Sequence, residues 1–114
     1  MFARVSTYQG DPDKLDEGTR YAVDQVLPRA RQMAGWKGIY VLVDRESGKQ
    51  LSVTLWESEQ DMRASEEAAN RLREELAEAS DETITDVERY EVAFYEAQGA
   101  TGGSLGASSE TAQA

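Results

Sequence analysis

Cysteine and histidine are both absent from this chain. Without cysteine, the sequence excludes disulfides, thiolate metal sites and a thiol nucleophile. Without histidine, it lacks the usual general base, the usual transition-metal ligand and the usual proximal ligand of haem. We therefore expect neither a metal nor a bound cofactor.

Basic residues are also scarce: 12 Lys and Arg stand against 22 Asp and Glu, a net charge of −10. Nucleic acids and anionic membrane surfaces bind positive patches, so we expect neither as a partner. No segment approaches the ~20 apolar residues of a spanning helix, and the N-terminus MFARVSTYQGD has no signal-like apolar run. These absences predict a cytoplasmic location.

The length and composition indicate one globular domain. The chain has 114 residues, of which 39% are apolar and 30% charged. The last residues are rich in Gly, Ala and Ser, and they cannot bury enough apolar surface to offset the entropy of ordering. We predict a domain over residues 1–96 and a flexible tail over residues 97–114. The glycines of this tail match neither the dinucleotide-binding nor the P-loop spacing.

Four segments show the two-residue alternation of β-strands. They are residues 2–8, 36–43, 50–56 and 87–95. The turn Arg45–Gly48 joins the second and third strands as a hairpin, and Gly48 is free to take a positive φ.

Two segments between these strands show helical spacing of apolar residues. The first begins at Asp11–Pro12, is kinked or interrupted by Pro28, and ends at Gly35. The second runs over residues 59–79 and is capped by the Ser58 hydroxyl. The order β-α-β-β-α-β predicts an α+β, ferredoxin-like fold, in which two helices cover one face of a four-stranded antiparallel sheet.

The uncovered face of this sheet should be polar if it faces water. Instead, the second strand contains the run Ile39–Val43, which is apolar on both faces, and the fourth carries aromatic residues on both. We therefore predict that the open face packs against the sheet of a second copy, in a two-fold homodimer.

Several short motifs occur along this pattern. They are V-L-P at Val26–Pro28, G-W-K-G at Gly35–Gly38, the R-E-S-G turn at Arg45–Gly48 and L-W-E-S at Leu55–Ser58. With the apolar second strand, they make residues 1–96 similar to the antibiotic-biosynthesis-monooxygenase family of dimeric α/β barrels. The resemblance implies a homodimer with packed sheets and, in each subunit, a pocket between sheet and helices.

Members of this family differ in activity. Some oxidise aromatic polyketides with molecular oxygen and no cofactor, and relatives degrade haem. The haem-degrading relatives use a His on the second helix and an Asn on the first strand, where this chain offers Ser65 or Glu66 and Ser6 or Thr7. Haem degradation by that route is therefore not expected.

The candidate substrate-binding residues are aromatic or cationic. Trp56 ends a strand at the corner to a helix, where it could stack on a flat substrate or simply fill the core. A buried Tyr hydroxyl or an Arg guanidinium could stabilise an oxyanion. Alternatively, a Tyr side chain could pack at a sheet or dimer edge, and an Arg side chain could form an ion pair. The candidates are Trp56, Tyr8, Tyr21, Tyr40, Tyr90 and Arg4. No general base is identified.

Two functions follow from these expectations. The first is a cofactor-independent monooxygenase acting on a hydroxylated aromatic or quinol-like small molecule. The second is a non-catalytic dimer of the same fold that binds a small hydrophobic or aromatic molecule or has a structural role. A pocket with convergent polar groups would favour the first function, whereas a pocket filled by side chains would favour the structural role.

Overall fold

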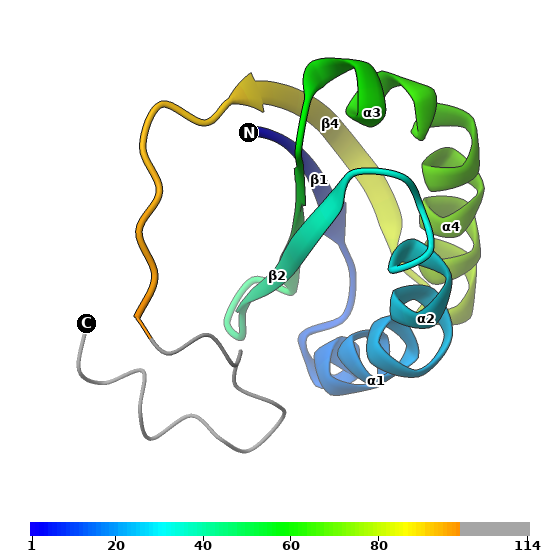
Figure 1. Ribbon diagram of the computed structural model, residues 1–114. Helices are drawn as coiled ribbons and strands as arrows, with labels where there is room; N and C mark the ends of the chain where they lie inside the picture. Colours follow the sequence, from blue (N-terminus) through cyan, green and yellow to red (C-terminus); the bar gives the residue numbers. More distant parts are fainter. Residues whose placement is uncertain (99–114) are drawn as a thin grey trace.

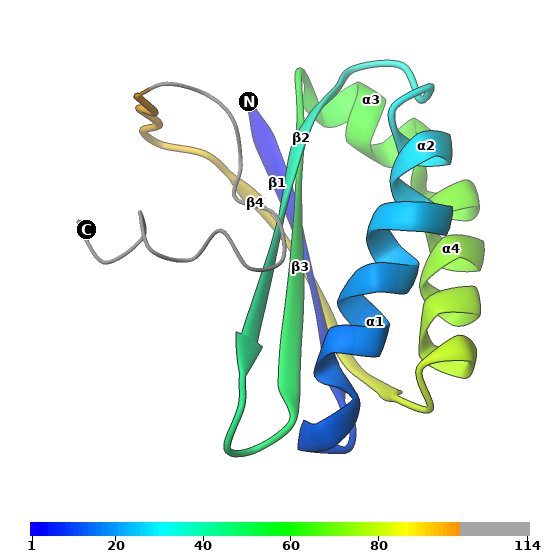
Figure 2. The same ribbon diagram turned by 90° about the horizontal axis from the view of Figure 1, so that it is seen from below.

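The computed structural model describes residues 1–98. One antiparallel sheet of four strands has the order β2-β3-β1-β4. The strands are β1 (Phe2–Gln9), β2 (Trp36–Asp44), β3 (Lys49–Trp56) and β4 (Thr83–Glu91). All the helices cover one face of this sheet (Figures 1 and 2). The predicted ferredoxin-like α+β fold is therefore confirmed. The predicted tail lies, from residue 99 on, outside the described residues.

The connection from β1 to β2 is a chain of short helical segments. They are η1 (Pro12–Lys14), α1 (Leu15–Tyr21), the π-helical η2 (Ala22–Val26) and α2 (Leu27–Ala30). The carboxylate of Asp11 caps the start by accepting from the amide of Asp13 at 2.9 Å. Pro28 has no amide to donate to the preceding turn, and the π-helical turn lies directly before α2. The predicted interruption at Pro28 is confirmed, and Gly35, with φ 77°, follows the last turn.

The second helical region differs from the single helix that we predicted over residues 59–79. It is divided into α3 (Glu59–Ala64) and α4 (Glu66–Ala79). The hydroxyl of Ser65 donates to the carbonyl of Met62 at 2.7 Å and accepts from Arg4 at 2.9 Å. These side-chain bonds compete with regular helix geometry, which is why the helix breaks there. The predicted cap is confirmed, because the Ser58 hydroxyl accepts from the amide of Asp61 at 3.0 Å.

The fourth strand was predicted over residues 87–95, and this range is wrong. β4 begins at Thr83 and ends at Glu91. Phe2, at the start of β1, pairs with Glu91, and the amide of Val92 donates to the carbonyl of Met1 at 2.9 Å. The pairing of the two strands therefore ends where β1 begins. The aromatic residues after Glu91 suggested a strand, but β1 sets the length of its neighbour.

The two faces of the sheet have an unusual distribution of polar residues. The pairs Arg4–Thr54, Ser6–Ser52 and Tyr8–Gln50 lie on the face that the helices cover. The opposite face carries apolar pairs such as Val5–Val53 and Leu42–Leu51. Polar side chains of β1 and β3 thus lie between sheet and helices. The open face is apolar over β2, β3 and part of β1, and it carries the charged Asp86 and Glu88 on β4.

The apolar core is small and lies beside these polar pairs. Tyr8, Ala22, Leu76 and Ala77 form a buried cluster between β1, η2 and α4. Within residues 1–98, no helix is both long and apolar enough to cross a lipid bilayer.

Candidate functional site

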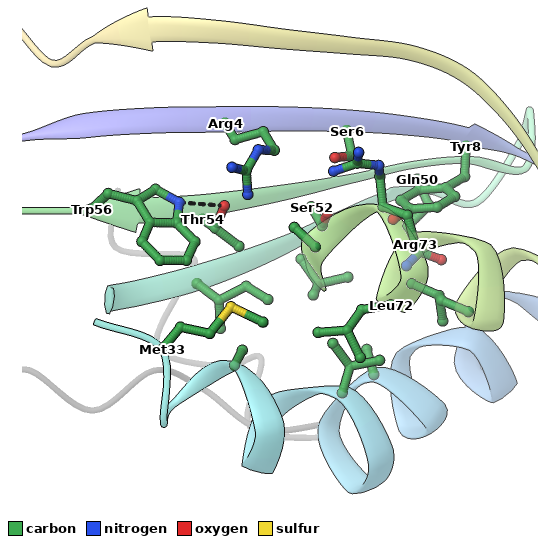
Figure 3. Close-up of a pocket in the computed structure, with 17 residues that line it drawn as sticks. Arg4, Ser6, Tyr8, Met33, Gln50, Ser52, Thr54, Trp56, Leu72 and Arg73 are labelled. Atoms are coloured by element: carbon green, nitrogen blue, oxygen red, sulfur yellow. Dashed lines mark hydrogen bonds between the residues drawn. The ribbon is translucent and has the colours of Figure 1, made fainter. Parts of the chain in front are cut away.

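A pocket lies between the helices and the polar face of the sheet (Figure 3). The strands contribute polar side chains together with Ile39, Val41 and Trp56, and the helices contribute mainly apolar ones such as Leu72. Met33 comes from the turn that follows α2. The enclosed cavity has a volume of about 50 Å³. Small-molecule sites have volumes of roughly 300–1,000 Å³, so a ligand with aromatic rings requires the lining side chains to move apart. The polar lining from the strands consists of Arg4, Ser6, Tyr8, Gln50, Ser52 and Thr54.

Trp56 and Arg4 form one end of the pocket. The indole of Trp56 is buried, and its Nε1 donates to the hydroxyl of Thr54 at 3.0 Å. The guanidinium carbon of Arg4 lies 5.3 Å from the centroid of the indole, a cation–π geometry. The indole is thus held by a hydrogen bond and an adjacent charge, which fixes the orientation of a flat apolar surface in the pocket.

Glu66 on α4 neutralises the charge of Arg4. Its Oε2 lies 3.0 Å from Nη2 of Arg4, and its two oxygens accept from Nε and Nη2 of Arg89, each at 2.7 Å. Hydrogen bonds from Arg89, and then from Arg4, hold the pKa of Glu66 at about 2. Nη2 of Arg4 also donates to the Met62 carbonyl at 2.6 Å. The network fixes the position of Arg4 above the pocket.

The other end of the pocket is formed by Tyr8, Gln50 and Arg73. Tyr8 and Gln50 are cross-strand neighbours, and Arg73 extends from α4 toward the sheet (Figure 3). Burial raises the pKa of the Tyr8 hydroxyl, an effect that the Ser52 hydroxyl and the Arg73 charge oppose. Both amide atoms of Gln50 and the Nε of Arg73 are buried without a hydrogen-bond partner among the described residues. This end therefore offers free donors to a ligand.

Glu82 lies close enough to the Tyr8 end for its charge to act on Tyr8. Burial raises the pKa of the Glu82 carboxyl, and one of its oxygens is buried without a partner. The Ser80 hydroxyl lies 2.5 Å from the Leu76 carbonyl and 2.7 Å from Oε1 of Glu82. The hydrogen bond with the Ser80 hydroxyl favours the charged form of Glu82 and so opposes part of the rise in its pKa.

We expect Glu82→Gln to raise the free energy of unfolding at pH 7. The raised pKa means that Glu82 stabilises the fold below its unfolded-state pKa and that this stability is lost as the pH rises through the folded-state pKa. Glutamine avoids that loss, so the advantage of the variant should disappear at pH 4 and below. Urea unfolding at both pH values measures this, with the exposed Glu78→Gln on α4 as the control. An equal advantage at both pH values would contradict it.

The six predicted candidates fall into three groups. Trp56, Tyr8 and Arg4 line the pocket. Tyr21 packs against the core cluster beside it. Tyr40 and Tyr90, which are 45% and 50% exposed, lie away from the pocket lining.

The two outlying tyrosines make local contacts. The hydroxyl of Tyr90 donates to Glu88 at 2.7 Å. A hydrogen bond with Tyr95 raises the pKa of Tyr40. The segment that carries Tyr95 leaves β4 on the side of the sheet opposite the helices (Figure 2).

Sequence reasoning missed Gln50 and Arg73. Gln50 has the same strand parity as Trp56, so the alternation already put both on one face. Arg73 follows Leu72, which belongs to the apolar stripe of the helix. Because this helix is rich in Arg and Glu, a charged residue in it is expected to face solvent. Within the described part of the chain, no three acidic residues come together as a possible metal site.

Comparison with known proteins found relatives without an assigned activity. No family model matches the chain. The uncharacterised proteins Rv2557 and Rv2558 of Mycobacterium tuberculosis are each 34% identical to it, over 93 and 77 residues. These matches cover 82% and 68% of this chain. The chain spans only 41% and 33% of the length of these relatives.

Solved structures share the fold. A candidate antibiotic biosynthesis monooxygenase from Deinococcus radiodurans has a TM-score of 0.62 at 18% identity, covering 90% of this chain and 100% of its own. A monooxygenase from the gene ActVA-Orf6 of Streptomyces coelicolor, in complex with the ligand nanaomycin D, has a TM-score of 0.59 at 20% identity, covering 90% and 92%. A dimeric ferredoxin-like protein from an uncultured marine organism has a TM-score of 0.62 at 14% identity, covering 86% and 100%. The chain therefore has the fold of the antibiotic biosynthesis monooxygenase structures, as the resemblance of its sequence predicted.

Proposed function

We propose that this protein is a cofactor-independent monooxygenase that acts on a hydroxylated aromatic or quinol-like small molecule. The observation that supports this best is the buried polar face of the sheet, which lines a pocket beside Trp56 and Arg4. Burying so many polar groups is unfavourable unless they have partners, and core packing alone does not require them. The complex of the Streptomyces coelicolor monooxygenase with nanaomycin D gives further support.

The proposed chemistry needs no electron source besides the substrate. A methylene beside a phenolic ring system is oxidised to a ketone, and O2 supplies the ketone oxygen while its other atom leaves as water with the two methylene hydrogens. The reactive form is the ionised substrate, which transfers electrons to O2. Positive groups in a low-dielectric pocket lower the substrate's pKa and so favour this form.

Each side chain in the pocket has a role in this proposal. Trp56 stacks on the aromatic system, and Met33 and Leu72 exclude water from its edges. Arg4, which lies beside Trp56, stabilises the oxyanion. No carboxylate belongs to the described pocket lining, so the substrate must lose its proton to water or bind already ionised.

The absence of a carboxylate from the described lining also favours the second candidate function. In that case the pocket binds an aromatic molecule without turnover. Binding with no oxygen consumption would identify this function.

Oxygen uptake tests the enzymatic proposal directly. We expect the purified protein to consume one O2 per molecule of anthrone or a related hydroxylated anthrone. Trp56→Leu should lower kcat/KM by about 10- to 100-fold, because the stacking surface is lost. Trp36→Phe is the matched control, since Trp36 does not line the pocket. No uptake above the buffer rate with any member of the panel, at high protein concentration, would refute the proposed activity.

We also propose that the protein is a homodimer through its open sheet faces. The apolar pairs on that face support this, as does the similarity to a dimeric ferredoxin-like protein. The cytoplasmic location and the absence of a nucleic acid, membrane or cofactor partner stay predictions from the sequence.

A further inference from the structure

We propose that Arg73, Gln50 and Tyr8 form a subsite that binds the carboxylate of an aromatic ligand. This inference rests on the proposed function in one respect, because it assumes that the ligand occupies the same pocket. It adds a substrate class, namely aromatic carboxylic acids, and names Arg73 as the residue that selects them.

The first support is that Arg73 is a buried cation without an ion pair. It is 8% exposed, and its only hydrogen bond among the described residues runs from Nη2 to the amide oxygen of Asn70 at 3.2 Å. Its Nε has no partner, and none of the ion pairs within residues 1–98 includes it. Burial lowers the pKa of Arg73, but a guanidinium keeps its charge at neutral pH.

The contrast with Arg4 shows which end of the pocket needs an anion. Glu66 pairs with Arg4 at 3.0 Å, so the charge at the Trp56 end is already compensated. Arg73 forms no ion pair among the described residues, and Glu66 and Glu74 act on its charge only from beyond ion-pair distance. Burying a charge without a direct partner is costly. A single ligand carboxylate would compensate it.

Gln50 provides the second support. Its side chain is completely buried, at 0% exposed, and neither its amide nitrogen nor its amide oxygen has a partner among the described residues. Such groups are rare in folded proteins, because each lost hydrogen bond costs free energy. Tyr8 is the cross-strand neighbour of Gln50 on β1, and its hydroxyl can also donate.

The number and type of these groups favour a carboxylate over other anions. The pocket holds one uncompensated positive charge, which matches a monoanion better than a phosphate dianion. Two separate donors, Nε of Arg73 and the Gln50 amide, match two carboxylate oxygens. A phenol is mostly neutral at pH 7, so it gains less from Arg73.

The subsite is also well separated from the stacking surface. Gln50 and Trp56 are six positions apart on β3, which is about 20 Å along the strand. A ligand that contacts both Trp56 and Arg73 must therefore be elongated, with its aromatic rings at one end and its carboxylate at the other.

Equilibrium binding of two matched probes tests the subsite without requiring turnover. The probes are naphthalene-2-carboxylate and its neutral analogue naphthalene-2-carboxamide, titrated by tryptophan fluorescence at pH 7. We expect the carboxylate to bind about 10- to 100-fold more tightly, as for hydrogen bonds to a charged group. Arg73→Gln should remove this preference while leaving the affinity for the carboxamide nearly unchanged.

Arg71→Gln is the matched control, because it removes the same charge from the same helix at a side chain that is 70% exposed. Thermal unfolding shows whether each variant is folded. If Arg73→Gln does not fold, Gln50→Met replaces it, and the same loss of preference is expected.

Each result of this experiment decides the proposal. A carboxylate preference that Arg73→Gln removes and Arg71→Gln retains would support the subsite. Equal binding of both probes to the wild type, or an equal loss in both arginine variants, would overturn the subsite but not the proposed function. If neither probe binds, both the subsite and the proposed function are overturned.

Discussion

Replacing Glu66 with Gln should lower the free energy of unfolding at pH 7 by about 3 kcal/mol, the low end of the cost of breaking a buried ion pair. Glu66 contacts Arg4 at 3.0 Å and Arg89 at 2.7 Å. Arg4 is 2% exposed, so without Glu66 its charge stays buried and uncompensated. Glu66 itself is 28% exposed, and partial solvation keeps the effect at the low end. Urea unfolding measures it.

The control is Glu67→Gln on the same helix. Glu67 pairs with Arg71 at 2.8 Å, but its side chain is 84% exposed, and exposed pairs contribute little. We expect the free energy of unfolding of Glu67→Gln to be almost the same as that of the wild type. Equal losses in the two variants would show that Glu66 does not compensate a buried charge.

The ion pair of Glu66 with Arg4 also makes the stability of the fold depend on pH. The folded-state pKa of Glu66 is about 2, below its ordinary value of 4.5. A depressed carboxyl pKa stabilises the fold above the unfolded-state pKa, and this contribution is lost as the pH falls from about 4.5 through about 2. The wild type should therefore lose its advantage over Glu66→Gln across this interval. A constant difference between the two proteins from pH 6 to pH 2 would contradict the role of this pair.

The second large effect concerns the open face of the sheet. We expect Leu42→Asp to weaken the proposed dimer by about 100-fold or more, because it puts a charge into an apolar interface. Leu42 is 52% exposed on that face, opposite Leu51 on β3. Native mass spectrometry and sedimentation measure the mass. The wild type should be a dimer, and the variant a monomer with an unchanged helical signal.

Val23→Asp is the control for this substitution. Val23 is 48% exposed, close to the exposure of Leu42, but it belongs to η2 on the helical side. This variant should remain a dimer. A monomeric wild type, or dissociation of both variants alike, would refute packing through the open sheet face.

The sequence predicted the element order because its signals are local. Alternation in the strands, the Ser58 cap and the position of Pro28 depend only on neighbouring residues. The end of β4 could not be predicted in this way, because β1 limits its length through pairing at Glu91. The break at Ser65 depends partly on Arg4, which is 61 residues away in the sequence.

The sequence predicted the residues of the candidate site only where the residue type is usually buried, as large aromatic residues are. Trp56 on β3 and Tyr8 on β1 are large aromatics on one face of the sheet, and both line the pocket. The polarity of that face was visible in the alternation of β3, but only the topology shows that the helices cover it. Burial of Arg73 depends on how α4 packs on the sheet, which local sequence does not reveal.

The central claim is that the pocket between the sheet and the helices binds an aromatic ligand. A crystal structure of the protein with naphthalene-2-carboxylate tests it most directly. We predict density for the rings between Trp56 and Leu72, with the carboxylate within hydrogen-bonding distance of Arg73. A ligand bound only on the open face of the sheet, or a pocket closed by its own side chains at saturating ligand, would contradict the claim.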